Sequence, residues 1–189
     1  MQHWTALLDA NVLYPAGVRD ILLRLADRGL FRPLWTAQIH DEWIRNLISD
    51  RPDLTAAKLH RTRSKMDEYF PEALVTGYES LIPGLDLPDP RDRHVLAAAI
   101  CARADVIVTR NLRDFPADRL TPHGLQAQHP DEFIRGLLDA QHGQVLAAVR
   151  DHRTALRNPP RSPEEHLAAL ESLGLVRSVS LLRDYMDAI

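Results

Sequence analysis

The chain has 189 residues, of which 45% are hydrophobic and 26% charged, and its formal net charge is −3. This balance is typical of a soluble globular protein, and the length excludes two full domains but allows one domain with an appendage. No apolar run is long enough to cross a bilayer, and the N-terminus has no basic, apolar leader. We therefore expect a cytoplasmic protein that does not contact a membrane.

The first part of the sequence alternates apolar runs with amphipathic segments. Residues 18–28 carry apolar side chains at helical spacing and are followed by Gly29, a typical helix terminator. Pro33 restricts residues 31–35 to a short edge strand or a turn, and Thr36 is suited to cap the next helix. The expected elements are a buried strand over 4–9, helices over 18–28, 36–50 and 54–70, and a strand over 73–76.

A second set of alternating elements begins at Asp89. Asp89 to Asp92 open a helix that runs to about residue 103, and the β-branched run within 105–109 predicts a strand. Residues 117–127 are expected to form a loop with at most a short strand, and residues 131–141 a helix. Strands that alternate with helices predict an α/β fold with a mostly parallel central sheet flanked by helices.

The character of the sequence changes after residue 141, where no further strand is predicted. Helices are expected over 145–156, 164–173 and 176–189, with a proline-rich turn between the first two. We therefore divide the chain into an α/β domain over 1–140 and an all-helical C-terminal extension over 141–189. Because about 50 residues rarely hold a core of their own, the extension must pack on the first domain or on a partner.

Acidic and polar side chains follow the predicted strands at the edge where a parallel sheet binds ligands. They are Asp9 and Asn11 after the first strand, Thr109, Asn111 and Asp114 after a later one, and Asp92 in the first turn of the helix between them. Carboxylates that converge repel one another unless a cation holds them, and such oxygen ligands select Mg²⁺ or Mn²⁺. The pattern therefore indicates a metal site.

Each of these residues also has a structural explanation. Asp89 and Pro90 are favoured at a helix start, and the helix dipole favours Asp92 in the first turn. Asp114 is compatible with an ordinary loop, and helical periodicity does not choose between the neighbours Asp41 and Glu42. The sequence has no GxSxG, P-loop or GxGxxG motif, which excludes the corresponding acyl-transfer and nucleotide chemistry.

A basic stretch offers a candidate surface for nucleic acid. Residues 45–65 contain six basic and two acidic side chains, and the basic ones include Arg45, Arg61, Arg63 and Lys65. Arginine outnumbers lysine 21 to 2 in the whole chain, and its planar guanidinium group suits phosphate contacts. A GC-rich genome and solvated helix faces explain the arginines equally well, so both interpretations stay open.

Taken in order, these segments resemble a PIN-domain nuclease, and more narrowly the VapC-type toxins of bacterial toxin–antitoxin pairs. The matching motifs are Leu7-Leu8-Asp9-Ala10-Asn11-Val12-Leu13, the stretch 35–47 with Glu42, Asp89-Pro90-Arg91-Asp92 with the helix after it, Val108-Thr109-Arg110-Asn111-Leu112-Arg113-Asp114, and the stretch 124–133. The resemblance covers about residues 1–140 and selects Glu42 over Asp41. Many relatives carry aspartate where this chain has Asn111.

The resemblance implies a PIN-like fold and a Mg²⁺- or Mn²⁺-dependent endoribonuclease that hydrolyses RNA phosphodiester bonds. The catalytic residues would be Asp9, Glu42, Asp92 and Asp114, the first three as metal ligands, with Asn11, Thr109 and Asn111 orienting them; whether Asp114 or Asn111 completes the site stays open. The implied partners are RNA, a cognate antitoxin protein and a second copy in a homodimer.

Two other functions fit the same residues. One is a housekeeping RNA-processing PIN nuclease without an antitoxin, and the other is a catalytically silent PIN-fold module that binds RNA or protein. Three carboxylates that meet without a metal would destabilise the fold by repulsion, which argues against the silent module.

Overall fold

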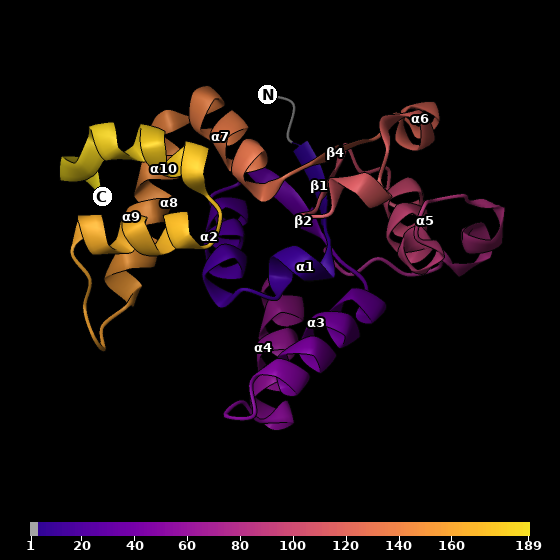
Figure 1. The fold of residues 1–189 in the computed structure, drawn as a ribbon, viewed down its shortest axis with the longest axis horizontal. Coiled ribbons are helices and arrows are strands. Elements are labelled where there is room, and N and C mark those ends of the chain that lie inside the picture. Colours follow the sequence, from indigo (N-terminus) through magenta and orange to yellow (C-terminus); the bar gives the residue numbers. More distant parts are fainter. Residues whose placement is uncertain (1–3) are drawn as a thin grey trace. The chain divides into compact units, whose positions relative to one another are not determined.

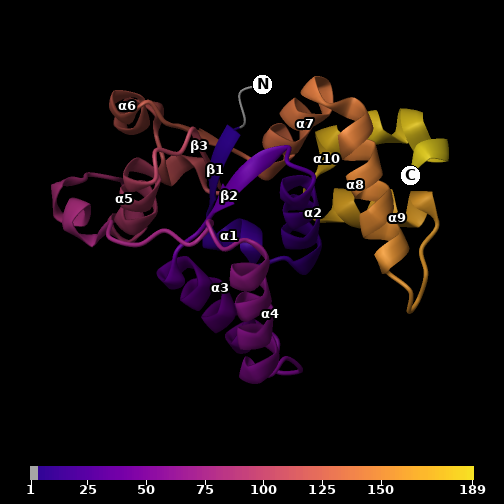
Figure 2. The ribbon, with the colours of Figure 1, turned by 180° about the vertical axis from the view of Figure 1, so that it is seen from behind.

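The computed structural model describes residues 4–189 of the chain. Its residues divide into two compact units, each built from two separate stretches of sequence. Unit 1 comprises the residues up to Tyr14 together with Arg32–Gln128, and unit 2 comprises Pro15–Phe31 together with His129–Ile189. The elements of both units are labelled in Figure 1 and are seen from behind in Figure 2.

The centre of unit 1 is a four-stranded sheet with the strand order β2-β1-β3-β4. Its strands are β1 (Trp4–Leu8), β2 (Phe31–Leu34), β3 (Val106–Val108) and β4 (Gln126–Gln128). The pairings β1–β3 and β3–β4 are parallel, and all three residues of β3 are buried. β2 lies at one edge, as its Pro33 predicts, because proline has no backbone N–H for a second neighbour. The predicted α/β class is confirmed.

The helices of unit 1 are α1 (Ala10–Leu13), α3 (Ala37–Asp50), α4 (Ala56–Tyr69), α5 (Arg93–Cys101) and α6 (Ala117–Leu120). Figure 1 shows α3 and α4 side by side as a hairpin. Asp67 of α4 accepts a hydrogen bond from Trp35 Nε1 at 2.8 Å and lies 3.1 Å from His40 Nε2 of α3. Thr36 caps α3 by accepting from the Ile39 backbone N–H at 3.0 Å, as predicted. These contacts fix the helix that carries Glu42.

Three predicted elements differ from the structure. The strand expected over 73–76 is only an isolated bridge between Trp35 and Leu74, because Thr36 turns the partner segment into the cap of α3 and ends the pairing. The helix expected from Asp89 begins as a 3-10 turn, Pro90–Asp92, before α5 starts. The loop expected over 117–127 contains the short helix α6 and a 3-10 turn, Thr121–His123, before it reaches β4.

Unit 2 is entirely helical apart from its junction with β2. It consists of α2 (Ala16–Asp27), α7 (Pro130–Ala140), α8 (His142–Ala155), α9 (Pro163–Ser172) and α10 (Val176–Leu182), with a terminal 3-10 segment, Arg183–Ala188. α2 packs along α8, as Figure 2 shows, and α10 contacts both α7 and α9. The apolar residues of the C-terminal helices that this packing buries include Leu146, Val149, Leu167, Leu170, Val179 and Leu182.

The apolar surface of the C-terminal helices is therefore largely covered inside the chain itself. Helices α2 and α7, which precede residue 141, belong to the same compact unit as α8 to α10. Among the large apolar residues of the C-terminal helices, Val176 is 53% exposed and Tyr185 is 42% exposed. Within residues 4–189, no helix combines the length and apolar character that a membrane crossing requires.

Candidate functional site

Asp9 lies at the carboxyl end of β1, at the point where the strand gives way to α1. Its side chain caps α1 by accepting from the Ala10 backbone N–H at 2.6 Å. It also accepts from Asn11 Nδ2 at 2.5 Å and from Thr109 Oγ1 at 2.7 Å. Only 6% of Asp9 is exposed, and this burial raises its pKa against the lowering effect of the hydrogen bonds from Thr109 and Ala10.

Asn11 and Thr109 hold the ends of β1 and β3 together around Asp9. Asn11 Nδ2 donates to Thr109 Oγ1 at 2.9 Å, and the Arg110 backbone N–H donates to Asn11 Oδ1 at 2.9 Å. Thr109 Oγ1 also accepts from the Asn111 backbone N–H at 3.1 Å. The network leaves the Asp9 carboxylate with a fixed orientation, which is a property that a metal ligand requires.

Glu42 reaches the same place from α3. Its Oε1 lies 3.0 Å from Nε2 of His94, a buried residue in the first turn of α5. The other ring nitrogen of His94, Nδ1, is buried without a hydrogen-bond partner among the residues described. Asp41, the neighbour that periodicity could not exclude, is exposed and pairs with Arg63 at 2.7 Å. The structure therefore places Glu42, and not Asp41, beside the other acids.

Asp92 is the half-buried residue between the 3-10 turn and α5, and its side chain makes no capping hydrogen bond there. Burial is the largest cause that raises its pKa, followed by the negative charges of Asp9, Asp89 and Asp114; together they bring it to about 7. Positive charge on His94 lowers this pKa, but it is the last of the causes, and no ion pair of Asp92 is found among the residues described. Asp92 is thus the acid of this site whose charge is least compensated by hydrogen bonds.

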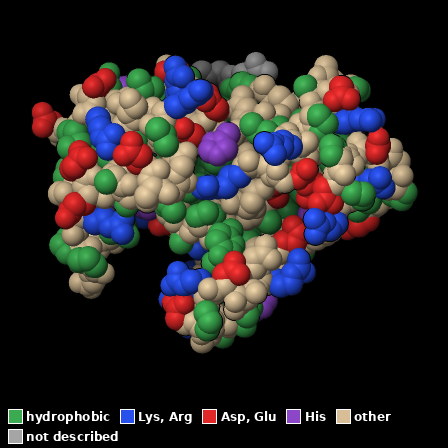
Figure 3. Space-filling view, viewed as in Figure 1, with side chains coloured by type: hydrophobic (Ala, Val, Ile, Leu, Met, Phe, Trp, Pro, Cys, Tyr) green, Lys and Arg blue, Asp and Glu red, His purple; other side chains and the backbone are tan. Residues whose placement is uncertain are grey.

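One pocket joins these side chains. It has a volume of about 280 Å³ and is lined by Asp9, Ala10, Asn11, Tyr14, Glu42, Asn46, Asp92 and Asn111. Three of these residues are acidic and none is basic. Figure 3 shows acidic side chains gathered near the position that α5 has in Figure 1, with basic side chains beside them. The lining of this pocket is therefore acidic.

A second group of carboxylates adjoins the first. Oxygen atoms of Asp89, Asp92 and Asp114 all lie within 4.8 Å of one another. Asp89 does cap its turn, accepting from the Arg91 backbone N–H at 2.9 Å, and it also pairs with the Arg91 side chain at 2.7 Å. Asn111 donates a hydrogen bond to Asp114. Asp92 therefore belongs to both groups, whereas Asp114 adjoins the pocket that Asn111 lines.

Two neighbours of the acids were not among the residues that the sequence singled out for chemistry. Asp89 was explained by its capping position, which the structure confirms, but that explanation did not predict its distance from Asp114. His94 follows Asp92 by two positions, and only the packing of α5 against the rest of unit 1 brings it to Glu42. A local signal for His94 was its place in the same first helical turn.

The candidate RNA-binding residues lie on the α3–α4 hairpin. Arg45 is exposed on α3 three positions after Glu42, and Arg61 and Lys65 are exposed on α4. Arg63 is less available, because it pairs with Asp41 at 2.7 Å and lies 3.8 Å from Asp67. Three of the four basic side chains are thus free of ion pairs among the residues described.

The fold and this pocket define a class of protein. The PIN-domain family profile matches residues 5–113, and a second profile, the VapC50 C-terminal domain, matches residues 130–184. The chain belongs to the PIN-domain family and carries a C-terminal region of the VapC50 type.

A more specific likeness is to a protein of Mycobacterium tuberculosis named "Putative ribonuclease VapC50". The two sequences are 42% identical over 98 residues, which are 52% of this chain and 57% of the relative. The aligned part of the chain thus spans little more than half the length of that relative. No solved structure matches the chain significantly.

Proposed function

We propose that this protein is a metal-dependent endoribonuclease and the toxin of a bacterial toxin–antitoxin pair. Membership of the PIN-domain family and the likeness to a relative named as a ribonuclease support a nuclease. The observation that carries the proposal is the pocket in which Asp9, Glu42 and Asp92 meet without a basic side chain. Such a set of oxygen ligands fits Mg²⁺ or Mn²⁺.

In this proposal Asp9, Glu42 and Asp92 hold the cation. When bound, the cation would polarise the scissile phosphodiester and activate water for in-line attack. Asn11 and Thr109 orient Asp9 through the hydrogen bonds described above. These two residues keep the carboxylate in place while RNA binds and leaves.

The fourth catalytic position is assigned to Asp114, with Asn111 as the residue that orients it. Asn111 lines the pocket and donates a hydrogen bond to Asp114, so its amide can hold the Asp114 carboxylate in a fixed position beside the pocket. Asp89 is added as a further acid beside Asp92 and Asp114. Arg45, Arg61 and Lys65 are assigned to the RNA backbone, with a smaller part for Arg63 because of its ion pairs.

The remaining assignments follow from the sequence and from the family, and not from contacts in the structure. They are a cognate antitoxin that blocks the acidic pocket, a homodimer, action in the cytoplasm, and the division into a nuclease domain over 1–140 and an extension over 141–189. Each is a proposal.

The test is brief expression of the chain in bacterial cells, followed by mapping of new RNA ends in total RNA. We expect new ends at defined sites, and we expect Asp92→Asn to reduce their yield by about 100-fold or more, because a metal ligand is removed. The matched control is Asp118→Asn on α6, an exposed acid outside the pocket, which should cleave like the parent.

Two further measurements separate the parts of the proposal. The purified chain should cut a short RNA with Mg²⁺ or Mn²⁺ and stop when EDTA is added. Cleavage that is insensitive to EDTA, or equal in the parent and Asp92→Asn, would refute the metal site. Cleavage without growth arrest would instead favour an RNA-processing role over a toxin.

A further inference from the structure

Unit 2 contains a second cavity, which the proposed function does not use. It has a volume of about 400 Å³ and lies among α2, α8 and α9. Its walls combine apolar side chains, among them Leu156, Leu170 and Leu173, with the polar side chains of Asp20, His152, Arg161 and His166. This volume is within the range of pockets that bind small molecules.

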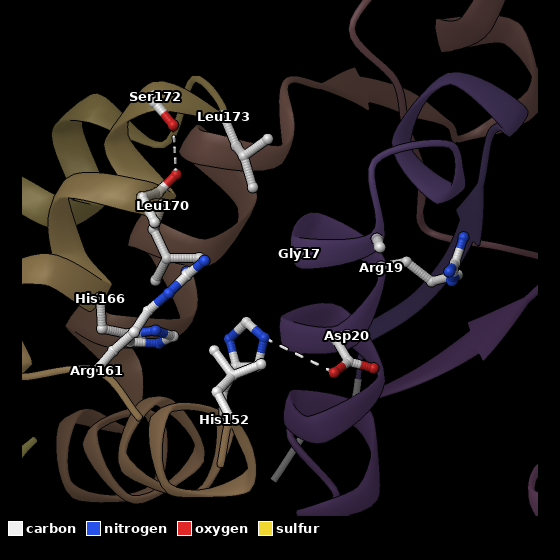
Figure 4. A pocket seen from close by; sticks show the side chains of 12 residues that line it. Gly17, Arg19, Asp20, His152, Arg161, His166, Leu170, Ser172 and Leu173 are labelled. Atoms are coloured by element: carbon white, nitrogen blue, oxygen red, sulfur yellow. Dashed lines mark hydrogen bonds and ion pairs between the residues drawn. The ribbon is translucent and has the colours of Figure 1, made fainter. Parts of the chain in front are cut away.

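Two buried histidines point into this cavity without the partners that their nitrogens require. Both nitrogens of His166 and Nδ1 of His152 are buried and make no hydrogen bond among the residues described. His166 is 1% exposed and His152 3% exposed. Figure 4 shows the ring of His166, the ring of His152 and Asp20 following one another across the cavity. Buried polar atoms are rarely left unsatisfied, so these three nitrogens indicate a missing partner.

The arrangement of the rings assigns a hydrogen-bonding role to each. Their centroids are 4.8 Å apart, and Nε2 of His152 lies 3.7 Å from Asp20 Oδ2. Burial holds the pKa of each ring at about 4, so both rings are neutral at pH 7. A neutral imidazole has one N–H donor and one acceptor nitrogen, and in His166, which lines the cavity, neither nitrogen is used by a residue that the structure describes.

The local charge decides which kind of ligand fits. Arg161 lines the cavity, and its positive charge is one cause of the low pKa of both rings. Among the residues described, no carboxylate pairs with its guanidinium group. Further positive charge reaches His152 from Arg24 and His166 from Arg153. Among the lining residues that the structure describes, the one acid is Asp20, and its side chain is 54% exposed.

The same contacts do not favour a metal ion. Within residues 4–189, His152, His166 and Asp20 do not form a group whose ligand atoms all lie within 4.8 Å of one another. The nearby guanidinium group would also repel a cation. An anion, in contrast, would gain from Arg161 and from the N–H of His166.

We infer that this cavity binds a small organic anion, whose carboxylate or phosphate oxygens accept hydrogen bonds from Arg161 and His166 and whose apolar part lies against Leu156, Leu170 and Leu173. All the residues that line the site belong to unit 2. The ligand carries an oxyanion group on a short apolar part, and the experiment distinguishes a carboxylate from a phosphate.

The experiment titrates the full chain in EDTA with four probes: inorganic phosphate, phenyl phosphate, acetate and hexanoate. Binding is followed by calorimetry and by the imidazole NMR signals of the wild-type protein. We expect phenyl phosphate or hexanoate to shift the signals of His152 and His166 and to bind more tightly than its small counterpart. A response to phenyl phosphate assigns a phosphate ligand, and a response to hexanoate assigns a carboxylate.

Two variants and a matched control locate the binding. Arg161→Gln and His166→Phe should each weaken binding of the responding probe by about tenfold, because each removes a hydrogen bond to a charged group. Arg150→Gln, an exposed arginine of α8 outside the lining, should bind like the parent. The spectra of the wild-type chain test the inference even if His166→Phe does not fold.

Three outcomes would overturn the inference. None of the four probes shifts the imidazole signals, which would mean that the nitrogens are satisfied by water. Binding occurs but is equal in the parent, Arg161→Gln and His166→Phe, which would place it elsewhere. Zn²⁺, added to the chain without EDTA, shifts both imidazole signals while the anions shift neither, which would assign a metal site instead.

Discussion

Asp92→Asn should stabilise the metal-free protein, and the gain should grow as the pH rises. In the folded chain the pKa of Asp92 is about 7, well above its ordinary value of 3.8. A carboxyl group with a raised pKa contributes its full stability below the unfolded pKa and loses it as the pH rises through the folded pKa. The wild-type protein therefore loses stability between about pH 4 and about pH 7, whereas asparagine carries no charge to repel Asp9, Asp89 and Asp114.

The magnitude follows from the same two pKa values. Without solvent screening, the difference between about 7 and 3.8 corresponds to about 4 kcal/mol at high pH. Asp92 is only half-buried, so screening reduces the expected gain to about 1–2 kcal/mol at about pH 8. Urea denaturation of the parent and Asp92→Asn in EDTA, at about pH 5 and about pH 8, measures this gain and its pH dependence.

In saturating Mg²⁺ the parent should become more stable than Asp92→Asn, which reverses the order expected in EDTA. A ligand that binds only the folded state adds more stability the more tightly it binds, with the logarithm of its affinity, and Asp92→Asn has one carboxylate ligand fewer than the parent. Glu72→Gln, which neutralises an exposed acid of unit 1 outside the pocket, should respond to neither pH nor metal in this way. The reasoning fails if Asp92→Asn is less stable than the parent in EDTA at about pH 8, or if its gain is the same at both pH values.

Three other predictions concern the histidine pair, the basic patch and the packing of α2. The folded pKa values of His152 and His166 are about 4 and lie below the ordinary 6.5. The contribution of the two neutral rings to the free energy of unfolding is therefore fully present above about pH 6.5, and it falls by about 2 kcal/mol per ring as the pH drops to about 5. Urea denaturation should show a weaker acid dependence for His166→Phe than for the parent. Replacing Arg61 and Lys65 with glutamine should lower the log–log salt slope of RNA binding by about one unit for each phosphate group that the variant no longer binds. An unchanged slope would mean that these two side chains do not bind RNA phosphates. A Cβ on Gly17 would lie 2.6 Å from Leu173 Cδ1, whereas a Cβ on Gly136 would meet nothing within 4 Å. Thermal melts should therefore show that Gly136→Ala is more stable than the parent by up to about 1 kcal/mol and that Gly17→Ala is not.

Local signals in the sequence were sufficient for most elements of the fold. Thr36 and Gly29 mark the ends of helices through capping and a positive φ, respectively, and both effects depend on a few neighbouring residues. Pro33 likewise indicated the edge position of β2, because proline has no backbone N–H to donate to a second neighbouring strand. The prediction of a strand over 73–76 was wrong because the pairing partner of this segment, Trp35, is distant in sequence and allows only an isolated bridge.

The candidate site divides in the same way. Asp9, Asp92 and Thr109 could be placed at one edge of a parallel sheet because topology brings the ends of its strands together. The choice of Glu42 over Asp41 depended on the resemblance to a family, since both flank the apolar stripe of α3 and helical periodicity does not choose between neighbours. The approach of His94 to Glu42 is a tertiary contact between α5 and α3, and no periodicity within either helix predicts it.

The membership of α2 in unit 2 has a consequence for how the protein is made. α2 leaves the ribosome soon after β1, but its partner α8 is synthesised only after the whole sheet of unit 1. Translation therefore produces a stage at which the apolar residues of α2 that pack on α8 have no partner and are accessible to chaperones. Unit 2 can be completed only when α8 to α10 have emerged, so ribosome-bound chains that end near residue 140 should expose α2 to proteases that cannot reach it in the finished protein.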